Sequence, residues 1–117
     1  MTAKMGMWRE HLVGTATGVT LTLTSEAVPS GERRYLSIVS VETDTTATSD
    51  VDCYMHSRGR KIPLYNVVNI GTALAKSRTM EFWMTEGEYM SYEFSGIVPT
   101  EVCEVGIFGH IQYKERK

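Results

Sequence analysis

The sequence predicts an all-β protein, an antiparallel two-sheet sandwich of the eight-stranded jelly-roll type with an extended N-terminal arm. Three observations support this prediction. Apolar and polar residues alternate along most of the chain, turn-forming clusters interrupt the alternation at short intervals, and no segment carries the period of an amphipathic helix. Short strands separated by such turns are typical of a sandwich or barrel. About eight strands can be counted, the number found in a jelly roll.

The chain has 117 residues, the size of a single domain with one hydrophobic core. We expect residues 1–18 to form the arm and residues 19–117 to form the sandwich. Glycines interrupt the weak helical spacing of the arm, so we expect an extended segment that becomes a strand near Arg9–Ala16. One alternative is a frayed terminus, which is common. The other is an arm that packs on this domain or on a neighbouring molecule, since an unanchored Trp8 would be unfavourable in a free tail.

The sandwich begins with a strand in which apolar residues alternate with threonines over residues 19–24. After the turn at 28–32, residues 33–43 form the longest strand, which has apolar residues on both sides. This pattern predicts a central strand covered on both faces, or a bulge near Ser37. Residues 44–50 form a polar loop. The last strand carries one apolar face from Cys103 to Tyr113, interrupted by Gly109.

A β-hairpin is predicted around a two-residue turn at Arg58-Gly59, because this turn places Met55 opposite Ile62. Pro63 cannot donate to a ladder, so the strand from residue 62 to 68 should be an edge strand or be bulged there. The same register pairs further residues: Cys53 with Leu64, His56 with Lys61, and Asp52 with Tyr65.

A second hairpin is predicted around a three-residue loop at 86–88, which pairs Met84 with Met90. This register has a cost, since Glu81 would face Glu93 and like charges in direct opposition are unfavourable. The conflict disappears if the two strands are not neighbours in a sheet.

The composition excludes several classes of function. The net charge is −2 and no basic patch dominates, which does not point to nucleic acid, and no apolar run is long enough for a membrane-spanning helix. The N-terminus lacks the apolar region of a secretion signal, so we expect synthesis in a cytosol. Cys53 and Cys103 lie far apart in apolar strands, and we expect buried, unreactive thiols rather than a disulfide.

No catalytic motif is present, and we expect neither an enzyme nor a bound cofactor. The histidines at 11, 56 and 110 lie on different predicted elements without ligands at metal-binding spacing, so no metal site is predicted. Glu81 and Glu93 are interpreted as part of an exposed sheet face rather than as an acid/base pair.

Candidate partner contacts lie in three places. Arg58, Arg60 and Lys61 form a basic hairpin tip that would suit an acidic protein surface. Trp83 offers a flat ring with carboxylates near it in sequence, which would dock a protein or stack on a sugar. Trp8 in the arm is the third candidate.

Three stretches carry a resemblance to a known group of proteins: VPSGERRYLSIVSV from Val28, TDTTATSDVDCYM from Thr43, and EGEYMSYEFSG from Glu86. Their turns and strands resemble those of small β-sandwich virion proteins of tailed phages, and the resemblance covers roughly Val28–Tyr113. It implies a structural virion protein, such as a capsid decoration or cement protein, many of which are homotrimeric jelly rolls. This group has no catalytic residues to carry over.

The leading hypothesis is therefore a non-enzymatic phage decoration or cement protein that binds the outer shell and stabilises it. Its partners would be the major capsid protein or another virion protein, and further copies of itself, with a trimer favoured. It would reside in the virion, which is assembled in the host cytoplasm. The alternatives are a neck, baseplate or fibre component, a carbohydrate- or host-binding module using Trp83 and Tyr92, and a small jelly-roll enzyme such as a cupin. A cupin needs clustered His and carboxylate ligands, which the sequence lacks.

Overall fold

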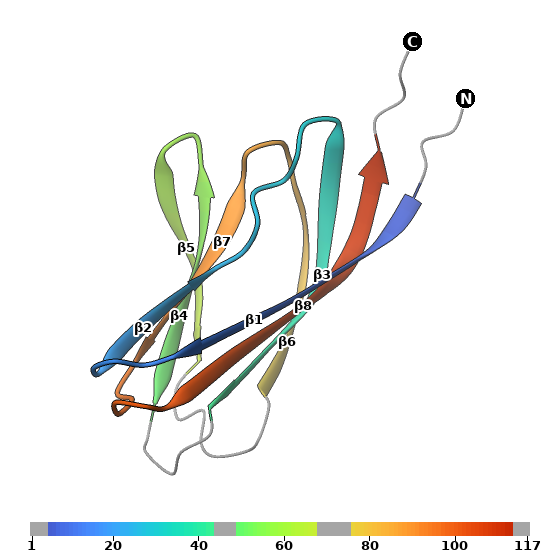
Figure 1. The fold of residues 1–117 in the computed structure, drawn as a ribbon. Coiled ribbons are helices and arrows are strands. Elements are labelled where there is room, and N and C mark those ends of the chain that lie inside the picture. Colours follow the sequence, from blue (N-terminus) through green and yellow to red (C-terminus); the bar gives the residue numbers. More distant parts are fainter. Residues whose placement is uncertain (1–4, 44–48, 68–75, 114–117) are drawn as a thin grey trace.

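The computed structural model describes residues 5–43, 49–67 and 76–113 of the chain. The described residues form eight strands (Figure 1): β1 (Met5–Thr15), β2 (Thr20–Thr24), β3 (Glu32–Thr43), β4 (Asp50–Ser57), β5 (Arg60–Val67), β6 (Lys76–Met84), β7 (Tyr89–Ser95) and β8 (Val102–Tyr113). They contain no helix with the length and apolar character needed to cross a membrane.

The strands form two four-stranded antiparallel sheets that pack face to face. One sheet has the order β1-β8-β3-β6 and the other the order β2-β7-β4-β5. Figure 1 shows the long strands β1 and β8 lying side by side. The chain crosses between the sheets at every connection except the one from β4 to β5, which gives a jelly roll. The predicted all-β sandwich is confirmed.

The core lies between the sheets and consists of the apolar residues that alternate along each strand. The largest fully buried side chains include Leu36 of β3, Met84 of β6, Phe94 of β7 and Ile107 of β8. They come from both sheets, so burial of these residues holds the layers together. Their partners on the same strands face outward and form the two outer surfaces of the sandwich.

The N-terminal segment belongs to the sandwich rather than forming a separate arm. Residues 5–15 are strand β1, which pairs with β8 along its whole length. Trp8 is only 2% exposed and packs within the core of this domain. The expected strand near Arg9–Ala16 therefore exists, but it starts earlier. Residues 1–4 lie outside the described ranges.

For residues 33–43 the central position and the bulge near Ser37 are confirmed, but the strand is not covered on both faces, because Ile38 is 43% exposed. It is also no longer than β8, since each has 12 residues. Strand β3 lies between β8 and β6, and its register with both neighbours shifts between Leu36 and Ile38, at Ser37. Gly109 of β8 lies beside this bulge, where a Cβ atom would stand 1.8 Å from the backbone oxygen of Tyr35. Only glycine allows the two backbones to approach so closely.

The predicted β4–β5 hairpin is present, with Met55 opposite Ile62 and His56 opposite Lys61. Its turn has positive φ at both Arg58 and Gly59, as a tight two-residue hairpin turn requires. Strand β5 is an edge strand, and its register shifts next to Pro63. Beyond this bulge the predicted pairing is wrong by one residue: Cys53 lies opposite Tyr65, and Asp52 lies opposite Asn66.

The predicted hairpin between β6 and β7 is wrong. Strand β6 pairs with β3 in one sheet, whereas β7 pairs with β2 and β4 in the other. Met84 and Met90 are both buried, but they approach the core from opposite layers. Glu81 and Glu93 are therefore not cross-strand partners, which resolves the charge conflict.

Both cysteines are buried and neither forms a disulfide, as predicted. Burial raises the pKa of the Cys53 thiol to about 12, although the nearby hydroxyls of Tyr92 and Tyr65 act in the opposite direction. A thiol with so high a pKa carries almost no thiolate at neutral pH, so it is a poor nucleophile.

Candidate functional site

The outer surface of the β1-β8-β3-β6 sheet carries large apolar side chains on all four strands. Met7 is 69% exposed, Ile38 43%, Phe108 42% and Trp83 39%. Single exposed apolar residues are common on protein surfaces, but neighbouring ones indicate a contact surface. We call this surface the aromatic face and define it by these residues: Met7, Arg9, Arg33, Tyr35, Ile38, Trp83, Phe108 and His110.

One row of the aromatic face crosses the whole sheet. Met7 lies opposite His110, His110 opposite Tyr35, and Tyr35 opposite Trp83. The rings of Tyr35 and Trp83 meet edge to face with centroids 5.1 Å apart, and Tyr35 stacks on His110 at 6.4 Å. The rings support one another, so the row forms a firm surface rather than a set of independent side chains.

A second row lies beside the first and consists of Arg9, Phe108 and Ile38. A Cβ atom at Gly106 would stand 3.2 Å from the Phe108 ring, so glycine leaves room for this ring above the sheet. The Arg9 guanidinium lies 6.0 Å from the centre of the same ring. A small hollow of about 220 Å³ opens between the rows.

Charges of opposite sign lie at the two ends of the aromatic face. At one end the Arg33 guanidinium stacks 4.5 Å above the Trp83 ring and donates to Gln112. At the other end Glu42 of β3 lies opposite Glu104 of β8. A hydrogen bond between these carboxyls, with partial burial and their mutual repulsion, holds the pKa of Glu42 above its ordinary value. His11 contacts Glu104 at 3.0 Å.

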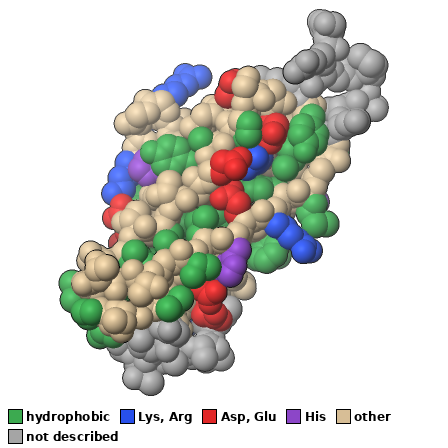
Figure 2. All heavy atoms as spheres, in the orientation of Figure 1, with side chains coloured by type: hydrophobic (Ala, Val, Ile, Leu, Met, Phe, Trp, Pro, Cys, Tyr) green, Lys and Arg blue, Asp and Glu red, His purple; other side chains and the backbone are tan. Residues whose placement is uncertain are grey.

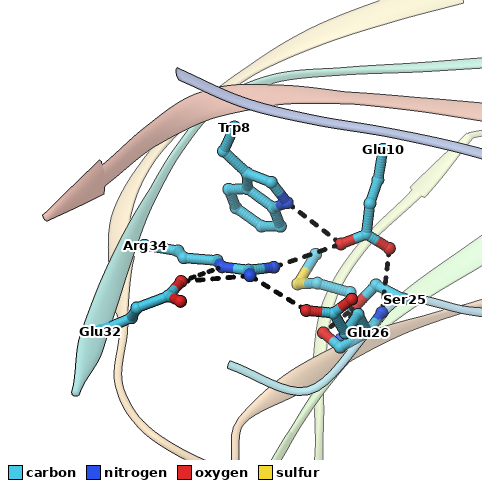
Figure 3. A network of polar contacts seen from close by, with 7 residues as sticks. Trp8, Glu10, Ser25, Glu26, Glu32 and Arg34 are labelled. Carbon is cyan, nitrogen blue, oxygen red and sulfur yellow. Dashed lines mark hydrogen bonds and ion pairs between the residues drawn. The ribbon is translucent and has the colours of Figure 1, made fainter. Parts of the chain in front are cut away.

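Trp8 was a candidate contact, and its burial excludes it from the surface. Its ring packs inside the sandwich, where it takes part in the polar network of Figure 3. The indole N–H donates to Glu10 over 3.0 Å, and the Arg34 guanidinium lies 5.4 Å from the ring centre. Trp8 therefore supports the sandwich from within and cannot touch a partner.

Arg34 is the centre of this network and is itself buried. Its guanidinium contacts Glu26 at 3.0 Å, Glu32 at 3.2 Å and Glu10 at 3.6 Å. Figure 3 shows the three carboxylates converging on it from β1, the β2–β3 connection and β3. A buried guanidinium is tolerated only when it is paired in this way. The network joins the two layers at one end of the core.

The other predicted contacts do not gather into one site. Arg58 and Arg60 are exposed at the tip of the β4–β5 hairpin. Lys61 forms an ion pair with Glu93 and lies 4.2 Å above the Tyr54 ring. These residues belong to the β2-β7-β4-β5 sheet, whereas Trp83 belongs to the other sheet. Glu93 is accordingly not a neighbour of Trp83.

The outer surface of the β2-β7-β4-β5 sheet is mainly polar, and we call it the polar face. It contains a hollow of about 380 Å³, the polar hollow, which is lined by Thr22, Thr24, Ser25, Ala27, His56, Tyr89, Ser91 and Glu93. His56 and Tyr89 stack with nearly parallel rings, 5° apart in plane and 4.5 Å between centroids. The His56 Nε2 atom is hydrogen-bonded to the Ser91 hydroxyl at 2.8 Å.

Sequence reasoning missed the polar hollow. The alternation of threonines in β2 indicated a hydroxyl face, but it could not indicate that β7 is the neighbouring strand. Tyr92, which was proposed as a binding residue, is fully buried, with 0% exposure. Burial raises the pKa of its hydroxyl well above the ordinary value.

Within the described ranges, no three His, Cys, Asp or Glu side chains lie close enough together to hold a metal ion. The histidines lie apart: His11 contacts Glu104, His56 stacks on Tyr89, and His110 stacks on Tyr35. The arrangement of the described side chains is suited to contact with partners, through an aromatic face on one sheet and a hollow on the other.

Comparison with known proteins supports the fold. No protein family model and no curated protein sequence matches the chain. Solved structures do match it over most of its length. A chain from the acidic stable capsid of Helicobacter pylori bacteriophage KHP30 has 13% identity over 92% of this chain and 92% of that chain, with a TM-score of 0.59.

Two further structures come from other settings. A protein of Bacillus endospore appendages, which form disulfide-linked pili, has 14% identity over 99% of this chain and 93% of that chain, with a TM-score of 0.58. The nucleoplasmin-like domain of Drosophila FKBP39 has 9% identity, covers 99% and 95% of the two chains, and has a TM-score of 0.53. At such low identities, the likeness shows a shared jelly-roll sandwich and not a shared function.

Proposed function

We propose that this protein is a non-enzymatic structural component of a phage virion, a decoration or cement protein that binds the outer shell and stabilises it. The observation that carries this proposal is the aromatic face, in which the rings of His110, Tyr35 and Trp83 support one another across β8, β3 and β6 and Met7 extends the row onto β1. The likeness to a chain of a phage capsid, and the resemblance of three sequence stretches to virion proteins, support the setting.

The aromatic face has the composition of a protein-binding surface. Trp, Tyr and Arg are the residues that most often dominate binding energy at protein interfaces, and here Trp83, Tyr35 and Arg33 are adjacent. Arg33 at one end and the Glu42–Glu104 pair at the other would fix the orientation of a partner, because they carry charges of opposite sign. The partner would be the major capsid protein or another virion protein.

Weak individual contacts suffice for such a protein if it is an oligomer. We expect a homo-oligomer, with a trimer favoured, because linked copies bind a repeating shell with a raised effective concentration. The disulfide linkage named for the Bacillus pili does not suit this chain, since both of its cysteines are buried and neither forms a disulfide. We expect assembly in the host cytoplasm and residence in the virion, with no role for nucleic acid or membrane.

Shell particles that lack the protein provide the test. Purified protein added to them should bind in a saturable manner and raise the temperature at which the particles break open. Phe108→Ser should weaken this binding at least about tenfold, since it removes an apolar side chain from the centre of the face. Val98→Ser is the matched control, because Val98 is 43% exposed but lies in the β7–β8 connection. Absence of binding, or equal binding by both variants, would contradict the proposal.

A neck, baseplate or fibre component would use the same face on another partner. The number of copies per particle separates these functions, since a shell protein is present in many copies and a neck protein in few. Quantitative mass spectrometry of purified particles measures this number.

A further inference from the structure

We propose that the polar hollow binds a small, uncharged, polyhydroxylated ligand, namely one or two sugar rings of a glycan. This inference goes beyond the shell-binding role, because it concerns the opposite sheet and rests on different residues. It also moves the sugar-binding hypothesis away from Trp83 and Tyr92, which lie on the aromatic face and in the core.

The size of the polar hollow limits the ligand. Ligand pockets usually range from about 300 to 1,000 Å³, and the hollow of about 380 Å³ is near the lower end. This volume suits a monosaccharide or disaccharide. The hollow also opens on a sheet surface, so a longer glycan chain would extend from it into solvent without a clash.

The lining of the polar hollow matches the chemistry of sugar hydroxyls. Thr22 and Thr24 present exposed hydroxyls from β2, and each hydroxyl can donate and accept a hydrogen bond. Glu93 adds a carboxylate that only accepts, and its ion pair with Lys61 compensates its charge. A polyol, whose hydroxyls also donate and accept, would satisfy these groups. An apolar ligand of the same size would leave them unpaired, which is costly.

An aromatic platform is also present. Tyr89 and His56 come from adjacent strands and stack in parallel at 4.5 Å. The hydrogen bond between His56 and the Ser91 hydroxyl fixes the position of the imidazole. A flat aromatic surface packs well against the C–H face of a sugar ring, while hydroxyl groups at the ring edge bond to polar neighbours. Binding sites on strands of a sheet are held more firmly than sites on loops.

The wall of the polar hollow is fixed by the backbone. Ser25 exchanges backbone and side-chain hydrogen bonds with Met90, at 2.8 Å and 2.9 Å. Val28 exchanges backbone hydrogen bonds with Gly87 and Glu88, at 2.9 Å each. These contacts hold the segment that carries Ala27 against the start of β7. The hollow is therefore formed before any ligand arrives, so binding loses little free energy in ordering the site.

Ligand-observed NMR with free sugars tests this inference. The probes are glucose, galactose, mannose, N-acetylglucosamine and lactose, with cyclohexanol as a ring of similar size that has a single hydroxyl. We expect weak, saturable binding of at least one sugar and none of cyclohexanol. The double variant Thr22→Val and Thr24→Val keeps the shape of both side chains and removes both hydroxyls, and it should lower the affinity about tenfold.

Two controls keep the test sharp. Thr20→Val changes the same residue type on the same strand outside the polar hollow, and it should bind sugar normally. Trp83→Ala, on the aromatic face, should also bind sugar normally. Tyr89→Leu is a further test variant, which should weaken sugar binding while circular dichroism confirms that it folds.

If no sugar binds, or if the Thr22→Val and Thr24→Val double variant binds sugar as the wild type does, the inference is wrong. Shell binding is measured separately, and the threonine variants should retain it whatever the outcome for sugars.

Discussion

The two outer faces of the sandwich have the same architecture and opposite chemistry. Each is the outward side of a four-stranded antiparallel sheet. On the aromatic face, large apolar side chains remain exposed, and Arg9 lies among them beside Phe108. On the polar face, charges and amides pair with one another, as Lys61 does with Glu93 and Asn66 with Asp52 at 2.6 Å. The aromatic face therefore has exposed apolar area that a partner could bury, whereas most charged groups named on the polar face already have hydrogen-bond or ion-pair partners.

This difference indicates which kind of partner each face suits. Burial of exposed rings needs a large complementary surface, which a folded protein supplies. A surface whose polar groups already pair gains little from such a partner, but its hollow can exchange water for a small polar ligand. On the side of the molecule drawn in Figure 2, apolar side chains lie next to acidic ones. Exposed apolar atoms are therefore not enough to identify a docking face.

The largest expected effect comes from Gly109→Ala. This substitution would separate β8 from β3 and so disrupt the sheet that supports the aromatic face. The new Cβ would stand 1.8 Å from the Tyr35 backbone oxygen, and a backbone atom in a central strand cannot move aside cheaply. We expect the free energy of unfolding to fall by about 3 kcal/mol or more. Urea denaturation measures it. Gly18→Ala is the control, because nothing lies within 4 Å of a Cβ there. Equal stability of both variants would show that β3 and β8 are not packed in this way.

Arg34→Ala should weaken the scaffold that both faces share. The substitution leaves Glu10, Glu26 and Glu32 close together without their cation. Loss of one partner from a buried ionic cluster costs about 3 kcal/mol, and salt should reduce the loss in this case because Glu26 is exposed. Arg60→Ala, at the exposed hairpin tip, should change stability little. Thermal melts at low and high salt provide the measurement, and equal melting of the two variants would argue against the network.

The fluorescence of the two tryptophans should distinguish the buried core, where Trp8 lies, from the exposed aromatic face, where Trp83 lies. Trp83 is 39% exposed and Trp8 only 2%, so acrylamide should quench the fluorescence of Trp83 and leave that of Trp8 nearly unchanged. Trp83→Phe should therefore remove the quenchable component. Binding of the partner to the aromatic face should protect Trp83 in the wild-type protein. A quenchable component that persists in Trp83→Phe would place Trp8 at the surface.

The smallest expected effect concerns the acidic end of the aromatic face. The pKa of Glu42 is raised by Glu104, so the folded protein holds this proton more tightly than the unfolded chain does. The resulting stabilisation is present below the ordinary carboxyl pKa of 4.5 and is lost as the pH rises through the higher folded value. Glu42→Gln should therefore stabilise the fold at pH 7 by about 0.2–1 kcal/mol, the range for cross-strand pairs.

This gain from Glu42→Gln should disappear near pH 4, where the wild-type carboxyl is also uncharged. Denaturation of both proteins across this pH range gives the answer, with Glu86→Gln in the exposed β6–β7 turn as the control. A gain of the same size at both pH values would mean that repulsion from Glu104 is not its cause.

The alternation of residues predicted most of what depends on local sequence. It identified the strands and the inward side of most of them, because burial of one face constrains every second residue. For residues 33–43 it left the inward side open and offered the bulge near Ser37 as one of two alternatives. It also placed Tyr92 on the buried side with Met90 and Phe94, and the sugar-binding role suggested for Tyr92 conflicted with this.

Sheet neighbours could not be predicted in the same way. Alternation shows which side of a strand is buried and not which strand lies beside it, so β6 and β7 were paired wrongly although they lie in different sheets. Both candidate sites depend on such neighbours. Tyr35, Trp83 and His110 meet only because β3 lies between β6 and β8, and Thr24 reaches the polar hollow only because β2 pairs with β7.

The central claim of the proposal is that the aromatic face docks on a phage shell. Cryo-electron microscopy of phage shells mixed with the purified protein is its most direct test. We expect the protein on the outer shell in many copies, with Trp83 and Phe108 buried against another virion protein or another copy of the chain, and with the polar hollow open to solvent. A map in which the protein is missing from the shell, or lies on it with the aromatic face exposed, would contradict the account.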